Sequence, residues 1–490
     1  MNYRIIRYVS GVIVLLEGLF LLFPALVSLV YAEYPDMGVF LGLAAVYTLF
    51  GFLMIRKKPQ QQAFFAKEGF VMVALSWIVL SVLGALPFVL SGAIPSFTDA
   101  LFETVSGFTT TGASILTDAL PNGMLLRYGM LFWRSFTHWI GGMGVLVFMM
   151  ALLPMAGGQG MYMMQAESTG PAVSKLVPSI RKTAALLYLI YFVMTVVQFV
   201  LLITVGKMPI FDAICSSMGT AGTGGFGVTS ASFACYSTEA QAITTIFMVL
   251  FGINFNAYFL LLRRRFKEAF KMQEVRWYLF IYVGLTAVVI ANLTAMGQLI
   301  GGDFWQTVHH AFFQTASVMT TTGYATVDFA VWPQAAMMLM CLLMFIGACA
   351  GSTGGGVKVS RLMLYVKYAA SGFSRMLHPR RVKVLKMDGK AVGSDTFRAL
   401  HVFLFCYVAI FIVSTIVLAF DSVGYDLETN ATATLATLNN IGPGLGAVGP
   451  TGNFAAYSDV SKWMMCFNML AGRLEIFPIL LFFIPATWKK

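Results

Sequence analysis

Three threonines followed by a glycine occur twice in this apolar sequence. FTTTGAS covers Phe108 to Ser114, and MTTTGYA covers Met319 to Ala325. Main-chain carbonyl and hydroxyl oxygens can replace the hydration shell of a monovalent cation. Glycine lets successive carbonyls turn to the same side, because this requires φ values that a Cβ disfavours. The residue types therefore indicate an oxygen-lined cation site.

Two further stretches align with this pair. DALFETVSGFTTTGAS starts at Asp99, DAICSSMGTAGTGGFG at Asp212, HAFFQTASVMTTTGYA at His310, and the most divergent, ATLATLNNIGPGLG, at Ala433. Each consists of a helix-compatible segment and a turn centred on glycine. In the fourth stretch, Gly444 competes with Gly442 as the anchor. The candidate cation ligands are Thr109, Thr110, Thr111, Gly112, Gly222, Thr223, Gly224, Gly225, Thr320, Thr321, Thr322, Gly323, Asn440, Ile441 and Gly442.

The composition places these stretches in a membrane. The chain has 490 residues, a mean hydropathy of +0.79 and only 11% charged residues. Its apolar runs of about 20 residues match a hydrocarbon layer of roughly 30 Å. The net charge of +11 comes from basic residues in short connections, which the positive-inside rule explains without nucleic acid. Six cysteines lack metal-binding or disulfide-framework spacing.

The apolar segments predict an all-α integral membrane protein. Segments 9–31 and 39–55 form a two-helix hairpin, and eight more follow in four pairs, near 70–91 and 128–153, 184–205 and 241–262, 277–297 and 335–350, and 398–420 and 462–487. Each pair encloses one semi-polar stretch. Bare backbone at membrane depth is tolerated where it lines an aqueous path or is buried in protein. Small residues also permit close helix packing, but four such loops on one face favour a span–pore-loop–span repeat around a pseudo-fourfold pore.

These patterns give the expected domains and orientation. The domains are the hairpin 1–66, pore repeat 1 at 67–156, a cytoplasmic linker at 157–183, pore repeat 2 at 184–270, pore repeat 3 with its cytoplasmic linker at 271–395, and pore repeat 4 at 396–490. The runs RRRFKEAFK at 263–271 and HPRRVKVLK at 378–386 lie between pairs. Both termini are therefore expected in the cytoplasm. Most acidic residues fall on the outer side, where they either attract cations or form an ordinary wet surface.

One span continues into FIGACAGSTGGGVKVSR, residues 345–361. Consecutive glycines disfavour a helix, so we expect a break in mid-membrane and a movable barrier below the turns. Val357 separates the last glycine from Lys358, which excludes a phosphate-binding P-loop. Arg473, at bilayer depth, either opposes cation occupancy in the pore or pairs with Glu475 or a loop carboxylate. The candidate gating residues are Gly351, Gly354, Gly355, Gly356, Lys358 and Arg473. Arg134 and His138 also lie within a predicted span, so the role of a polar side chain at bilayer depth has to be explained for them as well.

TTTGA, GTGGF, TTTGY and NNIGPGLG, in this order on paired spans, resemble the Trk/Ktr/HKT superfamily of potassium transporters over essentially the whole chain. NNIGPGLG is similar in particular to the TrkH family, membrane subunits of bacterial Trk uptake systems. The resemblance implies K⁺ uptake across the bacterial inner membrane, one key glycine per loop, and gating by the glycine-rich loop and Arg473. It also implies a homodimer, a cytosolic nucleotide-binding regulatory subunit of the TrkA type and no organic cofactor in this chain.

Two other functions remain open from the sequence. One is a sodium-coupled or sodium-permeable transporter of the Ktr/HKT type. A serine in place of a filter glycine would favour sodium permeability, but Gly112, Gly225 and Gly323 are all glycine. The other is an integral membrane enzyme that uses His309 and His310, for which no metal or nucleophile constellation is evident in the sequence.

Overall fold

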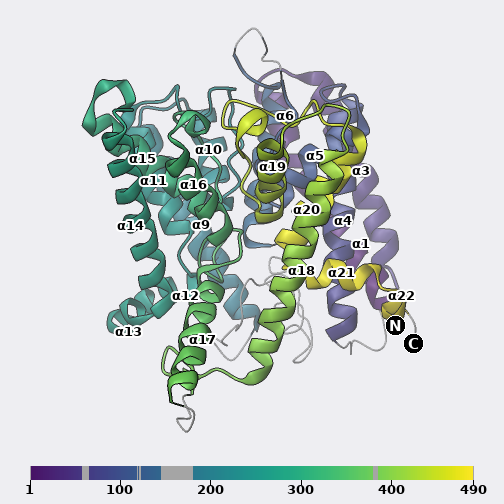
Figure 1. The fold of residues 1–490 in the computed structure, drawn as a ribbon. Helices are drawn as coiled ribbons and strands as arrows, with labels where there is room; N and C mark the ends of the chain where they lie inside the picture. Colours follow the sequence, from purple (N-terminus) through teal and green to yellow (C-terminus); the bar gives the residue numbers. More distant parts are fainter. Residues whose placement is uncertain are drawn as a thin grey trace.

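The structure is a computed structural model that describes residues 2–57, 66–117, 120, 123–144, 180–378 and 384–488. Regular structure in these ranges is helical, apart from one antiparallel hairpin of β1 (Lys386–Met387) and β2 (Lys390–Ala391). Figure 1 shows the long helices side by side, with both chain ends at the same end of the bundle as α13 (Phe266–Lys271) and α17 (Val359–Leu377). Of the expected linker 157–183, residues 157–179 lie outside the described residues.

The N-terminal hairpin consists of α1 (Tyr3–Phe20) with α2 (Leu22–Val30), and α3 (Tyr34–Ile55). Its helices pack closely through small residues. A Cβ on Gly51 would come within 2.8 Å of the Gly11 carbonyl oxygen, so the two backbones touch at this point. The hairpin lies against α4 (Ala66–Leu90). As a result, 56% of the α4 span is buried, against 28%, 28% and 22% for α9, α14 and α18.

Four units of the same design follow. Each has a long first helix, a short half-helix and a second helix. They are α4, α5 (Phe97–Phe108) and α6 (Tyr128–Met143); α9 (Ile180–Thr204), α10 (Ile210–Gly222) and α11 (Thr238–Phe251); α14 (Gln273–Ala295), α15 (Phe304–Met319) and α16 (Gln334–Ile346); and α18 (Ser394–Ala419), α19 (Leu427–Asn439) and α20 (Asp459–Arg473). The first helices have 23 to 26 residues, enough to cross a bilayer.

Three of the four half-helices start at an N-terminus with a side-chain cap. The side chains of Ser96, Asp303 and Asp426 accept hydrogen bonds from backbone N–H groups in the first turns of α5, α15 and α19. Such caps satisfy donors that a helix leaves unpaired. At the start of α10, Pro209 takes this position without a side-chain cap.

The four units close into a ring. Every half-helix packs on the first and second helices of its own unit and also on the second helix of the preceding unit. These cross-unit contacts are α10 with α6, α15 with α11, α19 with α16, and α5 with α20, which joins the last unit to the first. The half-helices are therefore enclosed by the long helices (Figure 1). The helical membrane architecture is as expected, and this cycle is consistent with the expected pseudo-fourfold arrangement.

The second helices differ from the continuous spans that the sequence predicted. α11 is followed, after a bend of 90°, by α12 (Phe255–Leu262). α20 ends at Arg473, where Glu475 and Ile476 adopt positive φ, and α21 (Phe477–Phe483) and α22 (Pro485–Trp488) follow. The expected spans 241–262 and 462–487 are therefore broken. Only the break after α16 was expected, because consecutive glycines mark it, whereas the other two segments carry only isolated interruptions such as Asn254 and Pro478.

The remaining segments are short. α6 ends at Met143, and the end of the expected span 128–153 lies outside the described residues from 145 onward. Three 3₁₀ turns, η1 (Ile300–Gly302), η2 (Phe329–Val331) and η3 (Gly446–Val448), lie in the connections around the half-helices of units 3 and 4. Large side chains such as Trp77, Trp133 and Tyr278 fill the core between the helices.

Candidate functional site

All four half-helices end in the same backbone motif. The residues in the left-handed αL conformation are Thr110, Thr223, Thr321 and Asn440, with φ of 55°, 57°, 61° and 55°. The N–H of each donates to the carbonyl three residues earlier, and the N–H of the next residue donates to the carbonyl five residues earlier. This pair of bonds defines a Schellman C-cap. The four turns thus have a common start.

Each αL residue is followed, two positions later, by a glycine with positive φ. The values are 80° for Gly112, 79° for Gly225, 84° for Gly323 and 98° for Gly442. Gly444 is not among the positive-φ residues of the described chain. Gly442, rather than Gly444, therefore has the conformation of the other three anchors.

The four glycines lie against one another's turns in a closed cycle. A Cβ on Gly112 would collide with the carbonyl oxygen of Gly224. Likewise, a Cβ on Gly225 would collide with the Thr322 carbonyl and one on Gly323 with the Ile441 carbonyl. A Cβ on Gly442 would lie 2.9 Å from the Thr111 carbonyl oxygen, which closes the ring. Any side chain at these positions would push two neighbouring turns apart.

The carbonyls of this ring have no protein partner. Within the described residues, the oxygens of Thr111, Gly224, Thr322 and Ile441 accept no hydrogen bond. All four residues are buried, and an unpaired buried carbonyl is costly. The glycines Gly112, Gly225, Gly323 and Gly442 together line one cavity of about 160 Å³. The turns thus present unpaired oxygens around a common axis.

The threonine hydroxyls have different tasks within the turns. Thr109 and Thr111 share a hydroxyl–hydroxyl bond of 2.8 Å, and so do Thr320 and Thr322. The Thr109 hydroxyl also donates to Val105 O, and the Thr320 hydroxyl to Ala316 O. These hydroxyls therefore bind the turn to its half-helix. In the fourth turn, Asn440 Nδ2 donates to the Thr111 hydroxyl at 3.0 Å and joins units 4 and 1.

The αL threonines are under backbone strain. A β-branched residue at positive φ is an outlier, and such a conformation costs about 1–3 kcal/mol. Thr110, Thr223 and Thr321 repeat it at equivalent places. Strain of this kind persists where the surrounding structure fixes the backbone for a function.

The glycine-rich segment between α16 and α17 lies directly against the turns. Gly355 N donates to the Thr321 hydroxyl at 2.6 Å, and Gly356 N donates to Asn439 O at 3.1 Å. A Cβ on Gly355 would collide with that same Asn439 carbonyl. The glycine-rich segment thus touches residues that precede the anchor glycines of the turns. The cavity, in contrast, is lined by the anchor glycines and by residues that follow them.

Two buried charged residues hold this segment. Lys358, at φ 82°, donates from Nζ to the Gly354 carbonyl. Glu274, in the first turn of α14, accepts a hydrogen bond of 2.6 Å from Ala350 N. Gly351 and Gly356 adopt positive φ, of 68° and 79°. The loop is therefore tightly packed and depends on glycine at several positions.

Arg473 connects three units below the turns. Its guanidinium donates to Thr353 O at 2.8 Å, and to Gly141 O and Gly142 O at 2.5 and 2.6 Å. It thus binds the glycine-rich segment to the C-terminal end of α6, where partial negative charge favours a cation. Among the ion pairs of the described residues, Glu475 pairs with Arg361 of α17 rather than with Arg473.

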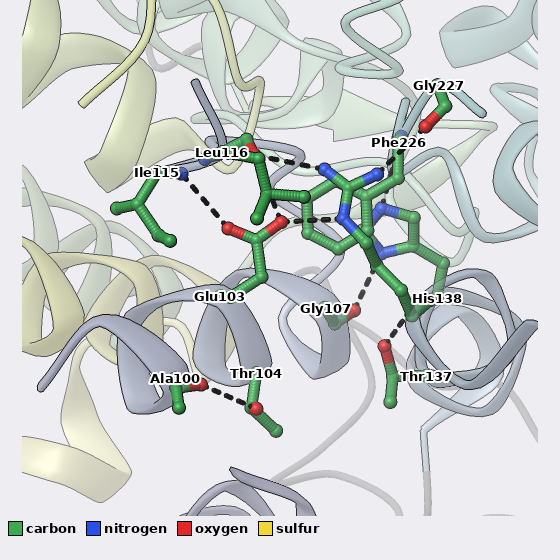
Figure 2. A network of polar contacts seen from close by, with 12 residues as sticks. Ala100, Glu103, Thr104, Gly107, Ile115, Leu116, Thr137, His138, Phe226 and Gly227 are labelled. Carbon is green, nitrogen blue, oxygen red and sulfur yellow. Dashed lines mark hydrogen bonds and ion pairs between the residues drawn. The ribbon is translucent and has the colours of Figure 1, made fainter. Parts of the chain in front are cut away.

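A buried network beside the first two turns was only partly expected (Figure 2). Arg134 and His138 were noted in the sequence, but Glu103, which pairs with Arg134, was read only as an outer acid. The sequence did offer a signal for Glu103, because it is an acidic residue within the helix-compatible stretch before a glycine turn. The described residues hold no cluster of three or more metal-ligating side chains. His309 instead bonds to Gln241, and His310 to Thr326.

Comparison with known proteins agrees with this geometry. Residues 36–490 match the TrkH family, described as a cation transport protein. The chain is 37% identical to the Trk system potassium uptake protein TrkH of Salmonella typhimurium, and 36% identical to that of Escherichia coli K12, each over all of both chains. It is 31% identical to TrkG of E. coli K12, over 99% of each chain. The crystal structure of the potassium transporter TrkH from Vibrio parahaemolyticus superposes with a TM-score of 0.87 and 33% identity, over all of both chains. This chain is therefore a membrane protein of the TrkH family of cation transport proteins.

Proposed function

We propose that this protein takes up K⁺ across the bacterial inner membrane through a selectivity filter made by the four glycine turns. The observation that carries the proposal is the closed ring, in which each anchor glycine abuts a carbonyl oxygen of a neighbouring turn. The relatives are potassium uptake proteins of Trk systems, which agrees with this substrate.

The chemistry of the ring suits a dehydrated monovalent cation. Carbonyl oxygens without hydrogen-bond donors can replace water around K⁺. The half-helices lead into the turns, so their partly negative C-terminal ends face the same region. The filter ligands that we propose are the turn residues 109–112, 222–225, 320–323 and 440–442. Potassium is here the transported substrate, not a resident cofactor.

We infer that the glycine-rich segment and Arg473 form the gate. The segment contacts Thr321 and Asn439 immediately before two of the anchor glycines. Arg473 adds a positive charge there and bonds to the segment through Thr353 O. Withdrawal of the segment would break these contacts together, so opening requires a driving force from elsewhere in the assembly.

That driving force would come from a separate subunit. The basic cytoplasmic residues offer a docking face for a cytosolic nucleotide-binding subunit of the TrkA type, with the membrane subunit as a homodimer and both termini inside. Lipids would surround the exposed apolar helices.

The decisive experiment measures K⁺ and Rb⁺ uptake by a transport-deficient bacterium and by liposomes, with the wild type and Gly112→Ser. We expect wild-type uptake of both ions. The serine Cβ would collide with the Gly224 carbonyl at a position of φ 80°, so Gly112→Ser should lose preference for K⁺ and Rb⁺ over Na⁺.

Gly42→Ser is the matched control, because a Cβ on Gly42 meets nothing within 4 Å. It should leave ion preference unchanged. An unaltered preference in Gly112→Ser would contradict the filter, and Na⁺-dependent uptake by the wild type would favour the sodium-coupled alternative.

A further inference from the structure

A fully buried ion pair lies beside the first two turns. Glu103 of α5 and Arg134 of α6 are in contact through Oε1 and Nε at 2.6 Å, and their side chains are 0% and 2% exposed. A buried ion pair is retained at a desolvation cost unless further hydrogen bonds satisfy both groups. This pair is satisfied by residues that immediately follow Gly112 and Gly225.

The carboxylate holds the first turn. Glu103 Oε2 accepts a hydrogen bond of 3.0 Å from Ile115 N, and Oε1 accepts one of 3.1 Å from the Ser114 hydroxyl (Figure 2). Ser114 and Ile115 lie two and three residues after the anchor glycine. The position of the chain after Gly112 is therefore set by one side chain of the half-helix that precedes it.

The guanidinium holds the second turn. Arg134 Nη1 donates to Gly227 O at 2.9 Å, and Nη2 donates to the Ser114 hydroxyl at 3.1 Å. Its planar group lies 3.4 Å from the ring centroid of Phe226. Arg134 thus bridges the residues after Gly112 to those after Gly225, which belong to different units.

His138 provides a parallel connection one helical turn further along α6. Its Nε2 accepts a hydrogen bond of 3.3 Å from Phe226 N. Nδ1 is then the donor, and it bonds to Gly107 O of α5 at 2.7 Å. The ring also stacks on Phe226, with centroids 4.1 Å apart. The second turn is consequently fixed to unit 1 at two points, one helical turn apart along α6.

The Arg134 charge lies at the wall of the cation path. Arg134 lines the same cavity as the four anchor glycines, where an unpaired positive charge would repel an entering cation. Glu103 cancels this charge. In unit 3, Gln314 occupies the place equivalent to Glu103 and donates to Val327 O at 2.6 Å. A neutral side chain can thus position a turn, so the ionic pair in unit 1 requires a reason beyond support.

We propose that Glu103 and Arg134 are positioning residues that set the spacing of the first and second turns, and with it the preference for K⁺ over Na⁺, while Glu103 neutralises Arg134 at the cavity wall. This inference rests on the proposed filter. The guanidinium carries the bridge between units 1 and 2, whereas the carboxylate holds the first turn and also supplies the compensating charge.

The test compares K⁺ and Na⁺ fluxes of purified protein in liposomes for the wild type, Glu103→Gln, Arg134→Gln and the double variant. Glu103→Gln leaves an uncompensated guanidinium, so repulsion at the cavity wall should lower K⁺ flux about tenfold, the low end of the effect of local charge on ion access. The double variant should recover much of this flux but should keep a reduced K⁺/Na⁺ ratio, because the bridge is absent.

Folding is controlled separately, because removing one partner of a buried pair destabilises a protein. Monodisperse protein on size-exclusion chromatography is required of each variant. Glu103→Asp and Arg134→Lys keep both charges but alter the bridge. If a neutral variant fails to fold, these two variants test the K⁺/Na⁺ flux ratio instead. Glu268→Gln, which removes one partner from the exposed Arg265–Glu268 pair, is the matched control. Its fluxes are measured in liposomes that lack the regulatory subunit.

The outcomes separate the two proposals. Absence of K⁺ flux in the wild type would contradict the proposed function itself. Wild-type K⁺/Na⁺ ratios in the folded Glu103 and Arg134 variants would overturn the positioning inference and leave the filter intact. A double variant with no more flux than Glu103→Gln would overturn the charge compensation.

Discussion

At the scale of single residues, the site depends on backbone conformations that its residue types disfavour. Thr110, Thr223 and Thr321 adopt αL, and each precedes a glycine by two positions. Glycine at the αL position would relieve this strain but would remove the side chain that packs behind the turn. At Thr321 that side chain has a visible task, because its hydroxyl accepts the bond from Gly355 of the glycine-rich segment.

Thr321→Val should therefore loosen the segment. Valine keeps the β-branched shape and leaves Gly355 N unpaired, which costs about 1–3 kcal/mol. We expect K⁺ leak through liposomes without the regulatory subunit to rise about fivefold or more, since about 1 kcal/mol is a factor of 5 in an equilibrium.

Deletion of Gly354 to Gly356 removes the same contact and should raise the leak further. Thr294→Val is the control, because the Thr294 hydroxyl bonds only within its own helix, to Ile290 O. A leak equal to the wild type in both gate variants would contradict the gating role.

At the scale of helices, the second helix of each unit stops short of a full crossing. α6, α11, α16 and α20 have 16, 14, 13 and 15 residues. A crossing needs about 20 residues. Three of these helices end next to residues that contact the glycine-rich segment or Arg473: Gly141 in α6, Phe251 in α11, and Arg473 itself in α20. The fourth, α16, leads directly into the segment. The breaks thus make room for the segment and supply its contacts.

One outer connection fixes the start of α20. Asp421, after α18, accepts hydrogen bonds from the Ser458 and Ser461 hydroxyls and from Ser458 N. Partial burial raises the pKa of Asp421, but the bonds from Ser458 and Ser461, with those from Val423 N and Ser458 N, outweigh it and lower the pKa to about 2. The ionised carboxylate therefore stabilises the folded state.

The resulting pH dependence has a definite sign. Because the folded pKa lies below the unfolded value of about 3.9, this stabilisation is present above about pH 4 and is lost as the pH falls through about 2. Asp421→Asn should lower the thermal unfolding temperature in detergent at pH 7. The gap to the wild type should narrow toward pH 3, and a gap that stays constant with pH would contradict this assignment.

At the scale of the whole molecule, four units share one axis, although their sequences have diverged. The cyclic packing of half-helices on preceding second helices brings together residues as distant as Thr111 and Asn440. The hairpin packs on one side of this ring, against α4 and α6. In the proposed mechanism, the glycine turns, the glycine-rich segment and the Glu103–Arg134 pair would therefore act together in one transport path.

The expected orientation can be tested with a native cysteine. Cys235, between α10 and α11, is exposed, in contrast to buried Cys215, Cys349 and Cys466. With both termini inside, this connection faces outward. A membrane-impermeant maleimide should label the wild type in intact spheroplasts, and Cys235→Ser should abolish the labelling.

Ser394→Cys in the Cys235→Ser background is the control. It places a thiol at the start of α18, on the expected cytoplasmic side, so it should react only after permeabilisation. The reverse pattern would show that the charge distribution was misread.

The sequence alone determined the membrane class, the hairpin, the four-unit repeat and the residues of the turns. These features are local or periodic: apolar length, glycine at a repeated place, and basic residues in connections. For the same reason, the break after α16 was predictable from consecutive glycines. That the turn residues bind K⁺ remains a prediction.

The tertiary structure alone decided which residues meet. Gly442 is distinguished from Gly444 by φ, which depends on packing against the Thr111 carbonyl. Arg473 bonds to carbonyls of distant helices rather than to neighbouring Glu475, and Glu103 joins Arg134 across two helices. The breaks after α11 and α20 were likewise not predicted, because isolated polar residues and glycines do not specify a break and the groups that compensate it come from other units.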